Sequence, residues 1–175
     1  MQNNFIDTID FWISELHRYD AIQLRIQPSE NSWSIGQVYM HLVENTCWLL
    51  EQVKRCATTN DHESADASPE AKKMFDENSF PDELLEGPPE NATTPQPVSK
   101  ETLLNDLFRL KEEILAAQYL ILNTRFKGKT KHPGLHYFSA AEWFKFAEMH
   151  FRHHIRQKKR IDAFLNIDRK GREAE

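Results

Sequence analysis

The 175-residue chain lacks the features of several large protein classes. It has no apolar run approaching the ~20 residues that a membrane-spanning helix needs. Its first twelve residues, MQNNFIDTIDFW, lack the basic region and apolar core of a secretion signal, so none is expected. Glycines number only five, and no segment shows the alternation of apolar and polar residues that is typical of β-strands. The sequence therefore predicts a helical protein with no membrane partner.

Cysteine is also scarce. The only two, Cys47 and Cys56, lie nine residues apart on one predicted helix. That spacing is ~13.5 Å along a helix axis, which is too far for a disulfide. Free thiols are expected in a reducing cytosol, so we expect a cytoplasmic protein.

Positive charge is in deficit, because the formal net charge is −5. This balance argues against a general affinity for nucleic acid. Basic residues gather only near the end of the last predicted helix: Arg152, Arg156, Lys158, Lys159 and Arg160. We interpret them as a solvated face that complements the negative end of the helix dipole, with a nucleic-acid patch as the alternative.

What the chain does contain is four segments with the 3.6-residue apolar periodicity of amphipathic helices. They are about Asn4–Arg25, Ser34–Cys56, Ser99–Arg125 and Ser139–Leu165. Ser34 with Gln37, and Ser139 with Glu142, have the spacing of capping boxes. The pattern predicts an all-α fold, a four-helix bundle with a long crossover between the second and third helices.

Residues 57–98 have a different composition. They contain six of the eight prolines and many Asp, Glu, Ser, Thr and Asn residues. Because no second core follows, we interpret them as a crossover within one domain that spans residues 1–175. PEAKKMFDE predicts a short helix there, and Phe80, Leu84 and Leu85 are expected to pack onto the bundle. Residues 166–175 are expected to form a flexible tail.

Two histidines occupy the apolar stripe of the last predicted helix. His150 lies at its centre and His154 follows one turn later. Residues four apart on a helix have Cβ atoms roughly 5–6 Å apart on one face, so this pair can bind one metal ion. Buried, hydrogen-bonded histidines are the alternative. His41, at the margin of the second helix's stripe, is the candidate third ligand, unless it is only a boundary histidine.

Four further polar residues are expected near these histidines. Glu44, three residues after His41, is a candidate base, the alternative being an exposed helix carboxylate. His153, at the edge of the last helix's stripe, is the other catalytic candidate. Asn45 and Gln157 are candidates to hold a ligand ring or a water molecule in place; for Gln157 the alternative is a polar residue at the end of the bundle.

Two absent motifs narrow the chemistry. There is no H-E-x-x-H sequence, so no metalloprotease-type general base accompanies the histidines. There is also no Glu-x-x-His pair, which argues against a di-iron carboxylate bundle. The remaining histidines lie off the predicted apolar stripes or in connections and are poorer ligand candidates: His17, His62, His132 and His136.

Two motifs resemble a known family. A W-S pair followed by His41, eight residues after the tryptophan, resembles the W-S-x6-H signature of the DinB/YfiT-like superfamily. The segment HPGLHYFSAAEWFKFAEMHFRHHIRQ is similar to that superfamily's last connection and helix, ending in H-x-x-x-H and, three residues on, Gln157. The resemblance implies a four-helix bundle with one divalent metal held by three histidines, which map onto His41, His150 and His154.

The same resemblance implies a function. Members of the superfamily include thiol S-transferases and isomerases that use low-molecular-weight thiols, and proteins classed as metal-dependent hydrolases. A metal-dependent enzyme acting on a small molecule is therefore expected, with a thiol cofactor if it is a transferase. The alternative is a non-catalytic metal-binding or stress-response protein. Zinc or nickel is expected, with iron or manganese as alternatives, because imidazole suits several metals.

Large apolar residues point to a partner. Trp12, Trp48, Phe108, Phe144 and Phe151 are more than the interior of one thin bundle needs, and Phe144 and Phe151 lie off the histidine stripe. An apolar surface of this kind predicts an interaction. Relatives commonly pair, so a homodimer is expected.

Overall fold

The computed structural model describes residues 5–81 and 93–167 of the chain. In these residues the chain is mostly helical, with five α-helices, one short 3-10 helix and a two-stranded hairpin. The elements are α1 (Phe5–Leu16), η1 (Gln23–Arg25), α2 (Ile35–Cys56), α3 (Pro69–Glu77), α4 (Lys100–Asn123), β1 (Lys129–His132), β2 (His136–Ser139) and α5 (Ala140–Leu165).

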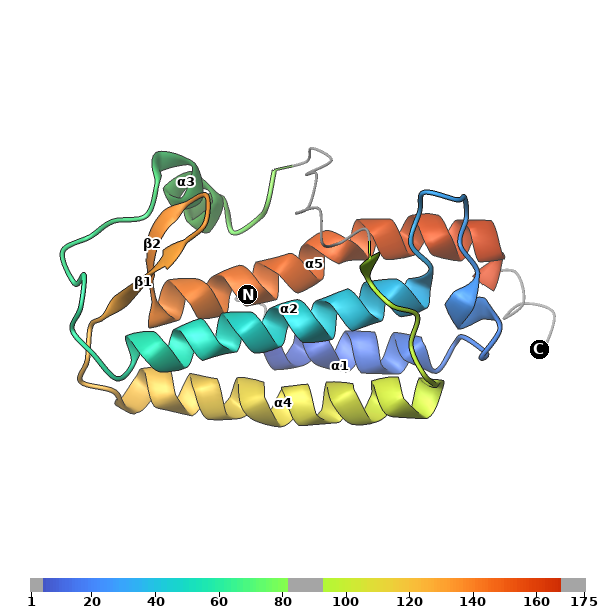
Figure 1. The fold of residues 1–175 in the computed structure, drawn as a ribbon, viewed down its shortest axis with the longest axis horizontal. Helices are drawn as coiled ribbons and strands as arrows, with labels where there is room; N and C mark the ends of the chain where they lie inside the picture. Colours follow the sequence, from blue (N-terminus) through green and yellow to red (C-terminus); the bar gives the residue numbers. More distant parts are fainter. Residues whose placement is uncertain (1–4, 82–92, 168–175) are drawn as a thin grey trace.

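The four long helices α1, α2, α4 and α5 lie side by side with nearly aligned axes (Figure 1). Helix α2 packs against α4 and α5, and α1 also packs against α4 and α5. Helices α2 and α4 run in the same direction, opposite to α1 and α5 (Figure 1). The chain between α2 and α4 must therefore return along their length, which explains a long crossover. Among the described helices, none has the length and apolar character to cross a membrane.

The predicted capping boxes begin two of these helices. At α2, Ser34 Oγ accepts a hydrogen bond from the Gln37 N–H (3.1 Å), and Gln37 Oε1 accepts from the Ser34 N–H (3.0 Å). At α5, Ser139 Oγ accepts from the Glu142 N–H (3.3 Å), and Glu142 Oε2 accepts from the Ser139 N–H (2.8 Å). Each box satisfies two amides that the first helical turn leaves free, which confirms both predicted starts.

The crossover contains the predicted short helix. PEAKKMFDE forms α3 with the expected bounds, and α3 packs against α5. Phe80 is buried as expected, and its ring lies 4.8 Å from that of Phe146, between centroids. The other two predicted anchors, Leu84 and Leu85, lie outside the described residues.

The first helix is shorter than predicted, because α1 ends at Leu16. Tyr19 turns into the core, where its hydroxyl donates to the Asp162 carboxylate. Asp20 Oδ1 then accepts from the Gln23 N–H at 2.8 Å and begins the separate turn η1. A short carboxylate side chain that bonds to nearby amides competes with a continuing helix.

The last connection contains strands that the sequence did not predict, so the fold is not purely all-α. Strands β1 and β2 pair antiparallel, with Lys129 opposite Ser139 and His132 opposite His136. In the turn, His132 Nδ1 accepts from the Gly134 N–H at 3.1 Å, and His136 adopts a left-handed φ of 67°. Each strand has only four residues, too few for a visible alternation.

The first two residues of the predicted tail, Asn166 and Ile167, take part in the end of α5. Asn166 caps the helix in a left-handed conformation with φ 55°. The side chain of Ile167 is buried. Of the predicted tail, the structure describes only Asn166 and Ile167, and residues 168–175 lie outside the described residues.

Two of the five aromatic residues expected at a partner surface are core residues. Trp12 and Phe151 are fully buried, and Phe144 is partly buried against the core. Only Trp48 and Phe108 are exposed, at 44% and 52%. The argument from the histidine stripe was wrong here because α5 buries a second face, against α1.

That second face also contains two of the basic residues predicted to be solvated. Lys158 is 2% exposed, and its Nζ donates to Glu15 Oε2 (2.5 Å) and Asp162 Oδ2 (2.6 Å). Arg152 forms a two-pronged ion pair with Glu148, through Nε and Nη2 at 2.7 Å each. Arg152 and Glu148, like Lys158 and Asp162, are four residues apart on α5. Only the pairing of Lys158 with Glu15 is beyond a sequence pattern, because Glu15 comes from α1.

Candidate metal centre

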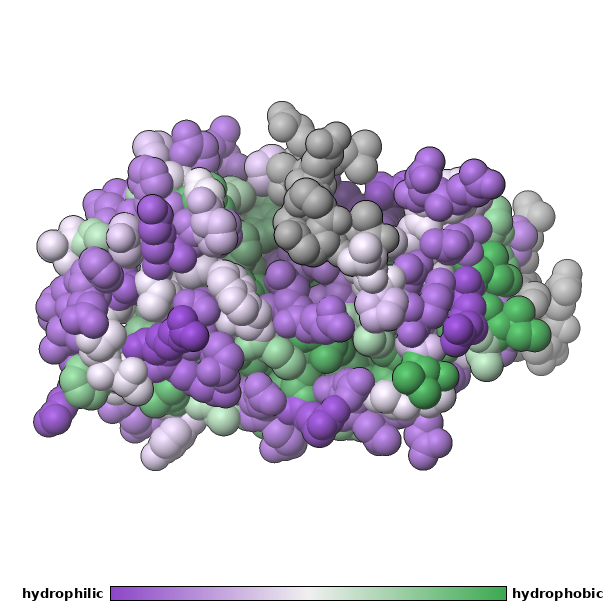
Figure 2. All heavy atoms as spheres, viewed as in Figure 1, coloured by the Kyte–Doolittle hydropathy of each residue, from purple (hydrophilic) through white to green (hydrophobic). Residues whose placement is uncertain are grey.

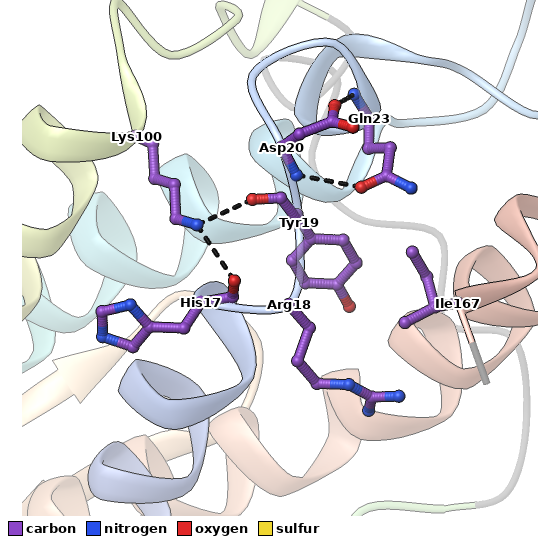
Figure 3. Close-up of a pocket in the computed structure, with 7 residues that line it drawn as sticks. All are labelled: His17, Arg18, Tyr19, Asp20, Gln23, Lys100 and Ile167. Atoms are coloured by element: carbon purple, nitrogen blue, oxygen red, sulfur yellow. Dashed lines mark hydrogen bonds between the residues drawn. The ribbon is translucent and has the colours of Figure 1, made fainter. Parts of the chain in front are cut away.

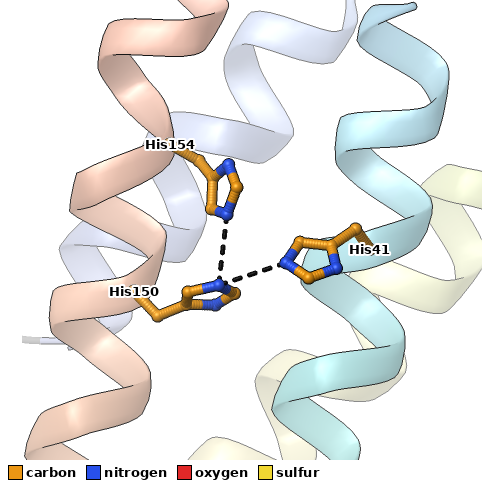
Figure 4. A group of neighbouring side chains, drawn as sticks. All are labelled: His41, His150 and His154. Atoms are coloured by element: carbon orange, nitrogen blue, oxygen red, sulfur yellow. Dashed lines mark hydrogen bonds between the residues drawn. The ribbon is translucent and has the colours of Figure 1, made fainter. Parts of the chain in front are cut away.

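The three predicted histidines come together between α2 and α5. His41 projects from α2, and His150 and His154 project from α5, with their rings turned toward one another (Figure 4). His150 Nε2 lies 3.1 Å from His41 Nε2 and 3.1 Å from His154 Nε2. All three nitrogens lie within 4.8 Å of one another, as in a group that could hold a metal ion.

The W-S-x6-H motif has a local structural explanation. Ser34 begins α2 through its capping box, and His41 follows two turns into the helix. Trp33, just before the cap, packs its ring against the His41 ring at 5.0 Å between centroids. The tryptophan and the cap thus help to fix both the start of α2 and the position of the imidazole.

The three nitrogens cannot all be satisfied by one another. A neutral imidazole nitrogen offers either one N–H or one lone pair. His150 Nε2 faces two other nitrogens at 3.1 Å, so it can make only one good hydrogen bond. A cation at the centre would accept all three lone pairs. Nitrogens bound ~2.0–2.1 Å from a tetrahedral metal are about 3.3–3.4 Å apart, close to the 3.1 Å that separates His150 Nε2 from each of the other two nitrogens.

Gln157 sets the tautomer of one imidazole. Its Oε1 lies 2.9 Å from His154 Nδ1. An amide oxygen only accepts hydrogen bonds, so His154 Nδ1 carries the proton and donates to Gln157. The Nε2 lone pair of His154 then points at the other two histidines, as a metal ligand requires. Gln157 therefore lies beside His154, a candidate ligand.

Burial keeps the three imidazoles neutral. It lowers the pKa of His41 to about 4 and, together with the neighbouring His41, lowers the pKa of His154 to about 3. Burial, followed by the nearby His154 and His41, holds the pKa of His150 well below 6.5. Neutral imidazole is the form that binds metals, so the group is ready to bind a cation at neutral pH.

The other predicted site residues lie at its margin. Glu44 is exposed and Asn45 is half-buried, and in the described part of the chain neither makes a side-chain hydrogen bond. His153 is outside the three-histidine group, but its ring lies 5.4 Å from the ring of His154. Burial and the nearby Arg160 lower its pKa.

The sequence analysis did not predict that aromatic rings lie beside the histidines. Phe80, from the crossover, lies 6.2 Å from the His150 ring and 5.5 Å from the His153 ring, between centroids. With Trp33 against His41, aromatic rings flank the group from two separate segments. The sequence analysis expected Phe80 to pack onto the bundle with Leu84 and Leu85, but nothing in the sequence placed its ring beside the histidines.

A pocket of about 370 Å³ lies apart from the histidines. Its lining residues are His17, Arg18, Tyr19, Asp20, Gln23, Lys100 and Ile167 (Figure 3). The Lys100 ammonium donates to the backbone carbonyls of His17 (3.1 Å) and Tyr19 (2.7 Å). None of the three clustered histidines contributes to this pocket, so it adds nothing to the candidate centre.

Comparison with models of known protein families shows which family the chain belongs to. The family model of the DinB superfamily matches residues 12–157, which include all three clustered histidines. The chain belongs to the DinB superfamily. The family predicted from the two motifs is thereby confirmed. The same comparisons find no significant match among curated proteins and none among solved structures.

In this DinB superfamily chain, the donor set itself limits the chemistry. Three imidazoles of the candidate group leave further coordination positions for small molecules, as catalytic sites do and closed structural zinc sites do not. The nitrogen spacing does not choose between metals, because imidazole binds zinc, nickel and iron alike.

Proposed function

We propose that this DinB superfamily protein is a four-helix bundle, built from α1, α2, α4 and α5, that binds one divalent metal ion. The Nε2 atoms of His41, His150 and His154 are the ligands, and zinc or nickel is the metal, with iron or manganese as alternatives. The observation that carries the proposal is the convergence of three neutral imidazoles whose hydrogen bonding the chain leaves incomplete.

We further propose that the centre is catalytic and acts on a small molecule, either by thiol S-transfer with a low-molecular-weight thiol or by hydrolysis. A metal ion held in this way supplies a Lewis acid that can activate a thiol or a water molecule. Gln157 holds the His154 ring in its ligating tautomer. The Trp33 and Phe80 rings lie beside His41 and His150 and give the centre an aromatic surrounding. Glu44 and His153 are the candidates to accept or deliver a proton.

A non-catalytic metal-binding or stress-response role is the second candidate. It is favoured by the aromatic rings of Trp33 and Phe80, which lie directly beside the histidines and narrow the approach to them. In this reading the metal, bound to the same three residues, stabilises the protein or is stored by it.

The decisive experiment combines elemental analysis of the native protein with assays of thiol transfer to electrophiles and of ester hydrolysis. We expect one metal per chain and an activity that His154→Ala removes. Metal without activity in either assay, for the native protein and for zinc- and nickel-loaded protein, would favour the second candidate. A native protein that holds no metal and takes up none would contradict both.

We also propose that residues 1–175 form one domain that works in the cytosol as a homodimer. The free thiols of Cys47 and Cys56 fit a reducing compartment. The homodimer needs a surface other than the one predicted from Trp12 and Phe151, since both are buried.

A further inference from the structure

The pocket of about 370 Å³ lies at the end of the bundle, away from the three histidines. Four segments meet there: the connection after α1, the turn η1, the first residue of α4 and Ile167 after α5 (Figure 3). Figure 2 shows apolar and hydrophilic residues side by side at this end of the molecule. Pockets for small molecules have volumes of about 300–1,000 Å³, so this one has room for an organic ligand rather than only a single ion.

Gln23 lines the pocket with a side-chain amide that is only half used. The residue is 8% exposed, and its Oε1 accepts from the Asp20 N–H at 2.9 Å. This bond fixes which end of the amide is the oxygen, because a backbone N–H requires an acceptor. The nitrogen, Nε2, lies on the side of Ile167 (Figure 3) and no described residue accepts from its two N–H groups. A ligand oxygen in the pocket would supply the missing acceptor.

Lys100 brings a positive charge that no carboxylate of the described residues pairs with. Its half-buried ammonium donates to the backbone carbonyls of His17 (3.1 Å) and Tyr19 (2.7 Å). An ammonium group has three donors, so one N–H remains for a ligand. Lys100 is also the first residue of α4, where the helix dipole adds positive potential. The two carbonyls thus hold the charge at the pocket without neutralising it.

Three other polar side chains of the pocket already have partners. Arg18 Nη1 bonds to Glu15 Oε2 at 2.7 Å, and the Tyr19 hydroxyl donates to a buried carboxylate of α5. Asp20 is the one acidic residue of the lining, and its Oδ1 accepts from two backbone N–H groups at the start of η1, at 2.8 and 2.9 Å. The groups left at Lys100 and Gln23 are donors, so the pocket favours a ligand that has acceptor oxygens and a negative charge.

We propose that this pocket binds a small organic anion, with its oxyanion at the Lys100 ammonium and a second oxygen that accepts from Gln23 Nε2. Carboxylates and phosphate esters share this chemistry, since both accept charge-assisted hydrogen bonds from an ammonium group. The inference is independent of the metal chemistry, because none of the three clustered histidines lines the pocket. A ligand that binds only the folded chain at this junction of helix ends also stabilises it.

The first test is an NMR titration of the isotope-labelled protein with succinamate and with glycerol phosphate. Each probe has one oxyanion and a second acceptor oxygen, and succinamide and glycerol are their uncharged counterparts. We expect an anion, but neither counterpart, to shift the side-chain amide signal of Gln23 and the backbone amide signal of Lys100. Saturation should fall in the millimolar range, because so few atoms make contact. The tighter probe distinguishes a carboxylate from a phosphate ester, and no saturable shift with either anion would overturn the proposal.

A variant separates the pocket from the candidate metal centre. A bound metal ion also attracts anions, so the titration is repeated with His154→Ala, which removes a proposed ligand. The signals of Gln23 and Lys100 should shift as they do in the wild type. Shifts that disappear in folded His154→Ala would place the anion at the histidines and overturn the pocket.

Matched substitutions test the two contacts. Lys100→Met removes the charge and should weaken binding by about tenfold or more. Lys111→Met is its control, because Lys111 lies on the same helix but pairs with Asp10 at 2.6 Å, and it should leave binding unchanged. Gln23→Glu keeps an oxygen for the Asp20 N–H but replaces the two donors by a carboxylate, so it should also weaken binding by about tenfold or more. Helical circular dichroism checks that each variant is folded.

A gain of binding completes the test. Asp20→Asn keeps the side-chain oxygen that accepts at the start of η1 and removes the one negative charge of the lining, so it should tighten anion binding by roughly threefold. A gain of this kind cannot result from unfolding. Unchanged affinity in folded Lys100→Met or Gln23→Glu, or weaker binding in folded Asp20→Asn, would overturn the assigned contacts.

Discussion

The two buried sides of α5 differ in whether their charged and titratable groups have hydrogen-bond partners. On the side facing α1, each buried charge has partners from the chain: Lys158 bonds to Glu15 and Asp162, and Glu148 bonds to Arg152. On the side facing α2, three imidazole nitrogens face only one another. A buried polar group left without a partner calls for an explanation, and a ligand is one such explanation. Because three imidazole nitrogens converge on the α2 side, we take the histidine side as the candidate ligand site.

The largest expected effect is on the histidine side. His41→Ala, His150→Ala and His154→Ala should each lower metal affinity by about 10³-fold or more, near 4 kcal/mol, because two imidazoles remain where three converged. Metal content after dialysis against a competing chelator measures this. His153→Ala is the control and should keep its metal, since His153 is outside the group. An empty His153→Ala site beside a filled His154→Ala site would reverse the assignment.

The next effect belongs to the α1 side and should leave the metal untouched. Lys158→Met removes the cation between two buried carboxylates, which should lower the free energy of unfolding by about 3 kcal/mol. Urea unfolding measures the loss, and metal stoichiometry should be unchanged. Lys159→Met, one residue on and exposed, should change stability by no more than about 0.5 kcal/mol. Loss of metal in folded Lys158→Met would contradict the claim that the α1 side of α5 does not affect metal binding.

These two sides were not equally visible in the sequence. The capping boxes at Ser34 and Ser139, and the 3.6-residue stripes behind them, predicted the starts of α2 and α5 because both signals are local. The histidine group followed from two short motifs on those helices. The pairing of Lys158 with Glu15 could not be predicted, since Glu15 is 143 residues away in the chain.

The features that the sequence did not predict involve contacts between different elements of the fold. The burial of Phe151 went unseen because one helical stripe was assigned to one packing partner, whereas α5 packs against both α1 and α2. The end of α1 was missed because Tyr19 is drawn inward by Asp162 of α5. The hairpin was missed because its strands are stabilised by contacts such as the Trp143 Nε1 hydrogen bond to Thr130 Oγ1, at 2.8 Å. The first two depend on tertiary structure rather than on local pattern, and the hairpin strands are in addition too short for a visible alternation.

In metal-free protein, the buried histidines should make the free energy of unfolding depend on pH. An unfolded imidazole protonates near ~6.5, whereas the pKa values of folded His41 and His154 are about 4 and about 3. Below pH 6.5 the unfolded chain therefore binds protons that the folded chain excludes. The contribution of these histidines to the free energy of unfolding is fully present above about pH 6.5. It is lost as the pH falls toward the pKa values of the folded protein. Between pH 7 and 5.5 each of these histidines should remove about 1 kcal/mol.

Urea unfolding with chelator at the two pH values measures that loss. His154→Leu should flatten the dependence, because it removes one of the depressed groups. Phe164→Ala is the control, since Phe164 is an exposed residue of the same helix and carries no titratable group, and its removal should leave the slope unchanged. A wild-type stability that rises as pH falls through this interval would contradict neutral burial of the histidines.

The smallest expected effect on metal affinity comes from Gln157, which orients one of the three histidines. Gln157 accepts from His154 Nδ1 at 2.9 Å and so directs the Nε2 lone pair toward His41 and His150. Gln157→Leu keeps the volume but frees the ring to adopt the other tautomer, so metal affinity should fall about tenfold, near 1.4 kcal/mol. Gln157→Glu, whose carboxylate also accepts from Nδ1–H, should retain or strengthen binding. Competition with a chelator of known affinity gives both values. Equal losses in the two variants would mean that Gln157 acts by packing alone, whereas a loss confined to Gln157→Leu would mean that its hydrogen bond sets the ligating tautomer.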